Sequence, residues 1–290
     1  MPEPGATTDR TQRGSKLLGN RPFLISTAST IVFFAIVVTV VVLAPGFRAV
    51  REAFFDWDSM KASFHGVPGE GLPSIWTAFA LNVKVFMIAE VFILVLGLMV
   101  AVIRQIPGPA FFPLRMVAIV YTDLFRGTPL LLVIYIFGYG IRALEIPGVS
   151  DQSLIFYGTA GLVLSYSAYV SEVYRAGIES VHPSQMAAAR SLGLNRWQSL
   201  RSVVLPQAVR RVIPPLLNDF VSLQKDTALL SILGVIEAAR AAGIYSAYRY
   251  NYSSLTVAAI LFILVTIPLA RFTDYLLARD RRRRAATGAP

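Results

Sequence analysis

Long runs of apolar residues, rather than amphipathic periods, dominate this chain. The residues from 23 to 44 carry no charge, and about 20 apolar residues of helix are enough to cross the roughly 30 Å hydrocarbon core of a bilayer. The run exceeds the roughly 7–15 residues of a signal-peptide core, and no small-residue cleavage site follows it. Five further apolar segments lie at 75–103, 112–141, 153–173, 206–235 and 252–277. The pattern therefore predicts six transmembrane helices in an all-α, polytopic membrane protein.

The composition agrees with that prediction, and the basic residues orient the chain. Hydrophobic residues make up 55% and charged residues 15%, whereas soluble domains carry about 25% charged residues. Of the 27 Lys and Arg residues, 18 lie in one alternating set of segments and six in the opposite set. The first set is 1–22, 104–115, 172–211 and 271–290, and the second is 45–74, 142–152 and 236–254. Because basic residues accumulate on the cytoplasmic side, both termini are predicted to be cytoplasmic.

The net charge of +10 is a common signature of nucleic-acid binding, but its distribution argues against that function. The Arg-rich stretch from Arg279 to Arg284 directly follows the last predicted span. Such a cluster is more simply a topology anchor that also contacts anionic lipid. The residues 1–22, rich in Thr, Gly and Pro, are predicted to be a disordered tail. We therefore expect membrane lipid, and no nucleic acid, as a partner.

Several kinds of chemistry are excluded by missing residues. The chain has no cysteine and only two histidines, His65 and His182, so a disulfide framework, a thiolate site or a histidine metal cluster is not expected. None of its four lysines follows a glycine, whereas a phosphate-binding P-loop needs Gly-Lys-Ser/Thr. An integral membrane enzyme is therefore disfavoured, and any ATP must be bound by another subunit.

The third predicted span contains a charged pair and a helix break. Asp123 and Arg126 lie three residues apart on one face, close enough to pair. Gly127 weakens the next turn, and Pro129 removes a helical hydrogen bond and restrains Thr128. Broken helices at membrane depth are tolerated where they are buried in protein or line a cavity, and transporters use them at substrate sites. The alternative is a kink whose ion pair only stabilises the bundle.

The fifth predicted span repeats this combination. Asp219 and Asp226 lie seven residues apart on one face, and Lys225 precedes Asp226. Pro206 suits the start of a helix, and Pro214 with Pro215 predicts a kink. Weaker features of the second span are Lys84 and Glu90, which can snorkel or pair locally, and the small-residue spacing Gly97 to Ala101, which permits close helix packing.

The loop 174–211 carries the most specific local signals. Ser184 is predicted to cap a helix that ends near Leu192, with Gly193 at its C-terminus. Asn195 followed by Gln198 predicts a capping box that opens a second short helix, ending before Pro206. The apolar residues Leu192, Leu194, Trp197 and Leu200 would then be exposed, which favours a docking surface over a bare linker. For the segment 45–74 a solvated loop is expected, although 47–57 is amphipathic enough to lie on the membrane surface.

Four motifs together carry a resemblance to a known family. The run Gln185-Met-Ala-Ala-Ala-Arg-Ser-Leu-Gly193, with Pro206 thirteen residues after the glycine, resembles the EAA loop of bacterial ABC importer permeases. Arg126-Gly-Thr-Pro129, Leu205-Pro-Gln-Ala208 and Lys225-Asp-Thr227 resemble motifs of the polar amino acid permeases within that group. The resemblance implies a five-helix type I importer core over 75–278, to which 23–44 adds an N-terminal helix, 45–74 an extracytoplasmic loop and 279–290 a basic tail.

The resemblance also implies partners and a mechanism. Such a permease, in the bacterial inner membrane, works with a homologous or identical second permease, a cytoplasmic ATPase dimer that binds ATP and Mg, and an extracytoplasmic amino-acid-binding protein. The chain itself would be no enzyme and would bind no cofactor. Glutamate is the favoured substrate, then glutamine or arginine, and an ion-gradient-driven secondary transporter is the alternative.

Roles for individual residues follow from the same resemblance. The substrate pathway would involve Arg126, Thr128, Lys225 and Asp226, and the helix breaks would be Gly127, Pro129, Pro206 and Pro214. Contact with the ATPase would involve Ser184, Gln185, Ala187, Ala188, Ala189, Gly193 and Leu194. One departure stands out, because the family has glutamate where this chain has Ala187 and glycine where it has Ser184. A cap by Ser184 would partly offset the lost glutamate at the helix N-terminus, so coupling is expected to survive.

Overall fold

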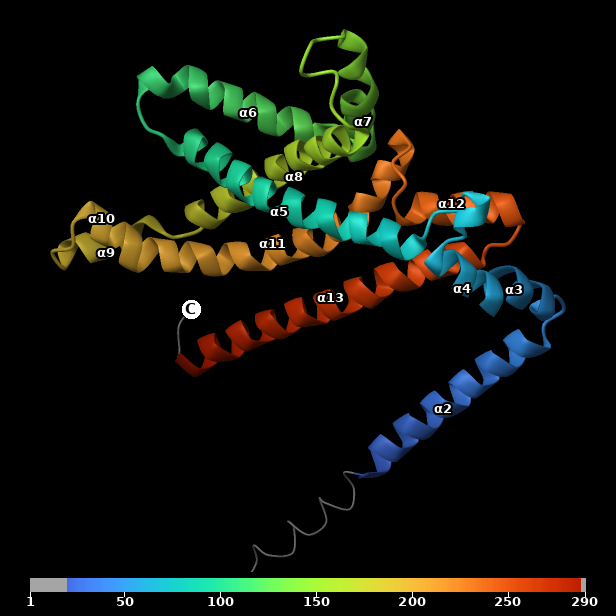
Figure 1. The fold of residues 1–290 in the computed structure, drawn as a ribbon. Helices are drawn as coiled ribbons and strands as arrows, with labels where there is room; N and C mark the ends of the chain where they lie inside the picture. The colour runs from blue at the N-terminus through green and yellow to red at the C-terminus, as the bar shows by residue number, and fades with distance from the viewer. Residues whose placement is uncertain (1–19, 288–290) are drawn as a thin grey trace, which may run out of the picture. The chain divides into compact units, whose positions relative to one another are not determined.

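The computed structural model describes residues 20–287, so most of the predicted N-terminal tail and the last three residues lie outside the described part. The described residues are nearly all helical and contain no β-strand, which confirms the all-α prediction (Figure 1). The chain divides into two compact units between Phe55 and Asp56. Four helices are long and apolar enough to cross a membrane, and six spans result if each of two bent helix pairs counts as one.

The first unit contains a transmembrane candidate and an amphipathic helix. The described side chains of helix α2 (Asn20–Leu43) carry no charge, are mostly apolar and are exposed. It ends in a turn at Gly46, whose φ of +97° favours glycine. Helix α3 (Phe47–Phe54) follows, with apolar residues gathered on one face. This stretch is therefore an exposed, amphipathic helix where a solvated loop was expected, and its position on the membrane surface stays a prediction.

The second unit begins with α4 (Trp57–His65), a further helix within the segment expected to be a loop. Asp56 caps this helix by accepting a hydrogen bond of 2.9 Å from the backbone N–H of Ser59. The hydrogen bonds from Ser59 stabilise the carboxylate and lower the pKa of Asp56. The backbone N–H of Asp56 in turn donates to Ser253 Oγ at 2.9 Å. These contacts tie α4 to the start of the last helix.

Three long helices form the uninterrupted spans of this unit, namely α5 (Ile75–Gln105), α8 (Leu154–Glu179) and α13 (Ser253–Thr287). Ser74 and Ser153 cap the first two. Helix α8 packs against α5, and a Cβ atom at Gly97 would lie only 2.7 Å from Val170 Cγ1. The predicted small-residue packing is thus confirmed. Helix α13 continues well past the predicted end at residue 277.

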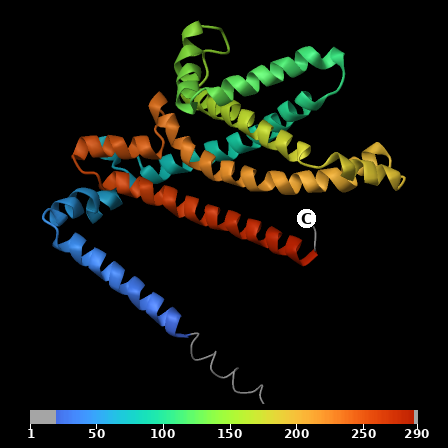
Figure 2. The ribbon, with the colours of Figure 1, turned by 180° about the vertical axis from the view of Figure 1, so that it is seen from behind.

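Two spans are bent. Helix α6 (Phe112–Gly127) and α7 (Leu130–Tyr135) belong to a pair bent by 107°, and the π-helical η3 (Ile136–Gly140) and the 3-10 helix η4 (Arg142–Leu144) continue the second arm. Helix α11 (Leu205–Asp226) runs into the 3-10 helix η6 (Thr227–Leu233), and this arm meets α12 (Ala238–Arg249) at 51°. Figure 2 shows both bends from behind. Helix α12 thus occupies most of the segment 236–254, which the count of basic residues assigned to the side opposite the cytoplasm.

The two prolines predicted to kink the fifth span do not end its helix. Pro214 and Pro215 lie inside α11, which continues through them. The chain turns instead at Gly234, whose φ of +87° lies in the left-handed region. Pro206 occupies the second position of α11, where a missing N–H is tolerated.

Helix α8 lies at the centre of the second unit, in contact with α5, α6, α7 and α11. The main apolar core joins Ile93, Leu162, Leu223 and Leu230 from α5, α8, α11 and η6. A second core joins α5 and α12 to α13 through Ile75, Phe79, Ala241 and Val257. Because α8 contacts four other helices, its side chains determine where the polar groups of those helices lie.

Candidate functional site

The 174–211 loop contains the predicted first short helix, α9 (Pro183–Ser191), but its cap differs from the prediction. His182 is the N-cap, and its Nδ1 accepts from the backbone N–H of Ser184 at 3.2 Å. Ser184 lies at the second helical position and its Oγ is 2.7 Å from the same nitrogen. The prediction that Ser184 caps the helix is wrong because Pro183, which suits the first helical position, starts the helix two residues earlier than expected. Ala187 accordingly lies at the fifth helical position.

The end of α9 follows the prediction closely. The backbone N–H of Gly193 donates to Arg190 O at 3.0 Å and that of Leu194 to Ala189 O at 3.2 Å. Gly193 has a φ of +86°, and this hydrogen-bond pattern is a Schellman motif, which favours glycine at that position. The predicted glycine corner is confirmed.

The predicted capping box is also confirmed. The Gln198 backbone N–H donates to Asn195 Oδ1 at 2.8 Å, and the Asn195 N–H donates to Gln198 Oε1 at 2.9 Å. The helix that it opens, α10 (Arg196–Ser199), does not end before Pro206 as expected. It continues through the π-helical η5 (Leu200–Val204) into α11. The N–H of Leu205 donates to Leu200 O to close the π turn, and Pro206, which has no N–H, follows directly.

The two faces of α9 differ in accessibility. Ala189 is buried, and Met186 packs against the small cluster of Val181, Val204 and Ala208. Ser184, Gln185, Ala187, Ala188 and Leu192 are exposed. Leu192 is 83% exposed and Trp197 66%, so the loop presents apolar side chains on a rigid, capped frame. That arrangement suits a docking surface.

Arg126 lies in the last turn of α6, next to the bend, and its side chain packs against α8. The Arg126 guanidinium lies 5.8 Å from the centre of the Tyr169 ring, and its Nη1 is 4.0 Å from Glu172 Oε2. The Tyr169 hydroxyl donates to the Arg126 carbonyl at 3.1 Å. Among the described residues no ion pair joins Arg126 to Asp123 or Asp226, so the predicted pairing with Asp123 is wrong. Glu172 and Tyr169 are the actual neighbours.

The predicted break itself is confirmed. Thr128 has extended backbone geometry, and both its N–H and its Oγ1 donate to Leu124 O, at 3.1 and 2.8 Å. Pro129 precedes α7, and its carbonyl accepts from the N–H groups of Leu132 and Val133 at 2.9 and 3.2 Å. Gly127, the last residue of α6, has open space beside it. The bend is therefore closed on both sides by hydrogen bonds rather than left loose.

Glu172 is the centre of an ionic cluster that sequence reasoning missed. Arg104 of α5 donates from Nη1 to Glu172 Oε2 at 2.7 Å, and Arg175 pairs with both Glu172 and Glu179. With Arg126 of α6 nearby, the carboxylate of Glu172 faces three arginines from three helices. The spacing of Glu172, Arg175 and Glu179 is a sequence signal for the local pairs. It says nothing of Arg104, which is 68 residues away.

A group of carboxylates lies between α5, α8 and α11. The Tyr166 hydroxyl donates to Asp226 Oδ2 at 2.7 Å. Asp219 and Glu90, both partly buried, interact electrostatically with each other and with Tyr166. The shared face predicted for Asp219 and Asp226 is thus confirmed. The structure attaches Asp226 and Arg126 to neighbouring turns of α8 through Tyr166 and Tyr169.

Lys225 lies apart from this group. Its side chain is exposed and lines a different pocket with residues of α13, among them Phe262 and Thr266. Consecutive residues of a helix point about 100° apart, which explains why Lys225 and Asp226 separate. Of the four residues predicted for the substrate pathway, Arg126 of α6 and Asp226 of α11 contact α8, and Thr128 lies at the bend beside Arg126. Lys225 does not join them.

A buried polar network holds the second break and was also missed. Asn82 Nδ2 donates to Thr227 Oγ1 at 3.1 Å and to Glu237 Oε2 at 3.0 Å, and Asn82 Oδ1 accepts from the Ala238 N–H at 3.0 Å. Glu237 caps α12 by accepting from the N–H groups of Ala239 and Arg240 at 3.0 and 2.7 Å. Asn82, Thr227 and Glu237 are at most 2% exposed. Thr227 of the Lys-Asp-Thr motif therefore has a structural role.

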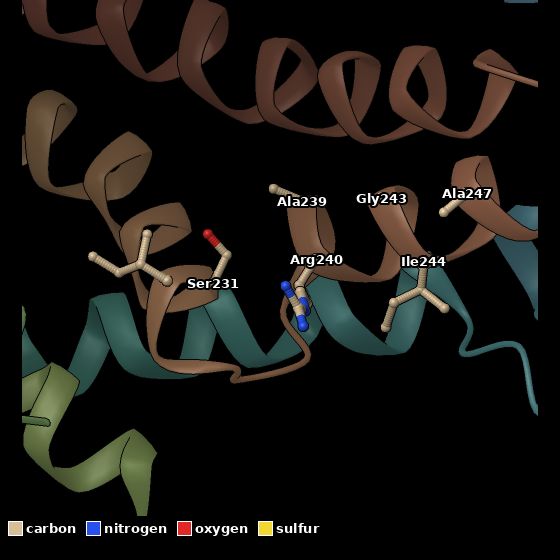
Figure 3. Close-up of a pocket in the computed structure, with 7 residues that line it drawn as sticks. Ser231, Ala239, Arg240, Gly243, Ile244 and Ala247 are labelled. Carbon is tan, nitrogen blue, oxygen red and sulfur yellow. The ribbon is translucent and has the colours of Figure 1, made fainter. Parts of the chain in front are cut away.

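An open pocket of about 510 Å³ lies beside α12. Figure 3 shows Ala239, Arg240, Gly243, Ile244 and Ala247 along that helix, with Ser231 from η6 opposite. Arg240 is the only charged residue among those that line it. None of the residues predicted for the substrate pathway lines this pocket.

Known proteins match most of the chain. Residues 93–282 match the family model described as binding-protein-dependent transport system inner membrane component. A probable amino-acid permease protein, YxeN, of Bacillus subtilis is 30% identical over 73% of this chain and 90% of its own length. A putative glutamine transport system permease protein, GlnP, of Rickettsia felis is 38% identical over 59% and 76%. An arginine transport system permease protein, ArtQ, of Bacillus subtilis is 30% identical over 68% and 88%.

Solved structures agree with the sequence matches. A crystal structure of an amino acid ABC transporter with histidines superposes with a TM-score of 0.64 and 28% identity, over 71% of this chain and 93% of that one. The inward-facing MetNI methionine ABC transporter superposes with a TM-score of 0.56 over 74% and 98%. Its 17% identity supports the fold alone.

Proposed function

Because the chain belongs to the family of binding-protein-dependent transport system inner membrane components, we propose that it is the permease subunit of an ATP-driven importer for a polar amino acid. The observation that carries the proposal is the capped, apolar knob of α9 and α10, which continues as one rigid element into α11. A secondary transporter has no need of such a knob. Relatives named for amino-acid, glutamine and arginine transport support the substrate class.

The proposed assembly has three kinds of partner. A cytoplasmic ATPase dimer, which binds ATP and Mg, docks on the exposed face of α9, where Gln185, Ala188 and Leu192 are accessible. A second permease, identical or homologous, completes the pathway, and an extracytoplasmic binding protein delivers the substrate. Both termini lie in the cytoplasm, as the distribution of basic residues favours.

Transport in this proposal is alternating access. Closure of the ATPase dimer on ATP displaces the loop helices, and the continuous helix from α10 to α11 transmits the movement to the spans. The binding protein releases the amino acid into the outward-open state, and hydrolysis resets the inward-open state. ATP shifts this equilibrium only as far as its complex prefers one state.

The charges between α5, α8 and α11 bear on which amino acid is carried. Glutamate is the first choice from sequence, yet the carboxylates of Glu90, Asp219 and Asp226 lie together between α5, α8 and α11. Carboxylates attract an ammonium or guanidinium group and repel a second carboxylate. Of the three candidates, this charge pattern favours arginine or glutamine over glutamate.

Competition for uptake tests the function and orders the substrates. Cells with and without the chain take up labelled arginine, glutamine and glutamate, each against an excess of the other two. Uptake that depends on the chain and is blocked by vanadate in the purified, reconstituted complex supports an ATP-driven importer. Vanadate-insensitive uptake driven by an ion gradient would instead support the secondary transporter, and glutamate-selective uptake would overturn the charge argument.

Arg126→Gln separates a pathway role from a structural one. If Arg126 meets the substrate carboxylate, uptake should fall about tenfold or more, because a hydrogen bond to a charged group contributes roughly 1.5–3 kcal/mol. The complex should assemble normally, as measured by co-purification of its subunits. Arg142→Gln, which removes an arginine from another helix end, is the matched control. Failure of assembly would assign Arg126 to the ionic cluster of Glu172.

Ala187→Glu tests whether the missing family glutamate matters. Ala187 is exposed at the fifth position of α9, where a carboxylate gains little from the helix dipole. His182 already caps the helix. The test measures how much the transported substrate stimulates the ATPase activity of the complex. Between Ala187→Glu and the unchanged protein this stimulation should differ less than about twofold, a free-energy difference of roughly 0.4 kcal/mol. Stimulation that appears only in the Ala187→Glu complex would show that this subunit is weakly coupled.

A further inference from the structure

An apolar groove of about 470 Å³ lies between α4 and α13. Figure 1 shows α4 beside the first turns of α13. Its lining from α13 is entirely aliphatic, and its lining from α4 combines apolar side chains with two basic ones. The residues are Trp57, Met60, Lys61, Phe64 and His65 of α4 and Val257, Ile260, Leu261 and Leu264 of α13. The volume falls within the roughly 300–1,000 Å³ that small-molecule pockets occupy.

The position of the groove along α13 indicates how deep in the bilayer the groove lies. The apolar candidate span begins at Ser253, and Leu264 lies 11 residues further on, which is about 17 Å along a helix. A hydrocarbon core is roughly 30 Å thick. The groove therefore runs from one end of the span toward the middle of the bilayer, as a lipid chain does. The hydrogen bond from Asp56 to Ser253 fixes α4 across its outer end.

The charges of α4 lie at the same end. Lys61 and His65 are one turn apart and exposed, and both line the groove. Asp58 of the same helix is exposed but does not line it. A lysine ammonium and an imidazole N–H both donate to phosphate oxygens. Trp57, 72% exposed, is the residue type that gathers at the headgroup level of membranes.

We propose that this groove is a phospholipid site. One acyl chain lies along the aliphatic side chains of α13, and the headgroup phosphate accepts hydrogen bonds from Lys61 and His65. The lining of α13 offers no side-chain hydrogen-bonding group, so a peptide strand would leave backbone groups unpaired there. An acyl chain has no such groups, and a phosphate matches the two basic residues.

Photocrosslinking tests the proposal on the full chain in its assembled complex. The complex is placed in nanodiscs that contain phosphatidylglycerol with a photoactivatable acyl chain, and adducts are mapped by mass spectrometry of peptides. We expect adducts concentrated on 257–264 and on α4. Adducts spread evenly over all exposed apolar positions of α13 would overturn the proposal, because ordinary lipid contact predicts that result.

Two pairs of variants separate the headgroup from the chain. Lys61→Glu should reduce groove adducts about fivefold or more, whereas Arg142→Glu, an equal charge change outside the groove, should not. Leu264→Trp should fill the groove and remove its adducts, whereas Phe272→Trp, at a similarly exposed position of α13 outside the groove, should not. Unchanged adducts in Lys61→Glu, or equal labelling by a photoactivatable alkane without a phosphate, would refute the headgroup contact. Co-purification of the subunits confirms that each variant assembles.

Discussion

Asn82→Ala is expected to lower the stability of the second unit by about 2–4 kcal/mol. The variant removes three hydrogen bonds at once, to Thr227, to Glu237 and to the N–H of Ala238. A buried group that loses its partner costs roughly 1–3 kcal/mol, and more where a carboxylate is involved. Thermal unfolding of the purified complex should show a fall in Tm on the order of 5–15 °C.

The same network predicts a second, non-additive result. Glu237 both accepts from Asn82 and caps α12, so the effects of Asn82→Ala and Glu237→Gln should not add. Asn218→Ala is the matched control, because it removes an exposed asparagine from α11. Equal unfolding temperatures for Asn82→Ala and Asn218→Ala would contradict the assignment of Asn82 as the residue that holds the break between η6 and α12.

Glu172→Gln is expected to lower the stability of the second unit, because it removes the ion pairs that join α5, α6 and α8. Arg104 is only 15% exposed and Glu172 21%, so loss of the carboxylate leaves a partly buried arginine without its counter-charge. Breaking a buried ion pair costs about 3–5 kcal/mol, and partial exposure should reduce this to roughly 2–3 kcal/mol. Uptake should also fall, because Arg126 at the bend of α6 and α7 loses its acidic neighbour.

Glu179→Gln provides the matched control for this cluster. Glu179 also pairs with Arg175, but it is 53% exposed, and exposed pairs contribute about 0–1 kcal/mol. Glu172→Gln should have a lower unfolding temperature and lower uptake than Glu179→Gln, measured side by side. Glu179→Gln should resemble the unchanged protein. Two variants of equal stability would show that the cluster contributes nothing beyond surface pairing.

Local signals predicted much of the loop and of the first break. The Schellman turn at Gly193, the capping box of Asn195 and Gln198, and the bend at Pro129 each depend on a few consecutive residues, so sequence suffices to find them. The cap of α9 was misplaced by two residues, because both His182 and Ser184 can cap a helix and Pro183 between them suits the first helical position. The second short helix was expected to end before Pro206, because the π turn that joins it to α11 leaves no obvious sequence signal.

The polar contacts between helices were beyond local reasoning. Sequence spacing offered Asp123, three residues away, as a local partner for Arg126, but the structure gives it Tyr169 and Glu172 of another helix. The partners of Asn82 lie 145 and 155 residues along the chain. Periodicity identifies the face of a helix on which a side chain lies, but not the helix that this face meets.

The sequence by itself determined that this protein crosses the membrane several times, which segments do so, and where its exposed, capped loop lies. These properties follow from the hydrocarbon thickness and from hydrogen bonds between near neighbours. Only the tertiary structure decided that α8 is the central helix, that Glu172 gathers three arginines and that Asn82 holds the second break. Those contacts depend on how helices distant in sequence pack, because an ion or amide in a low-dielectric interior must find a partner wherever the fold places one.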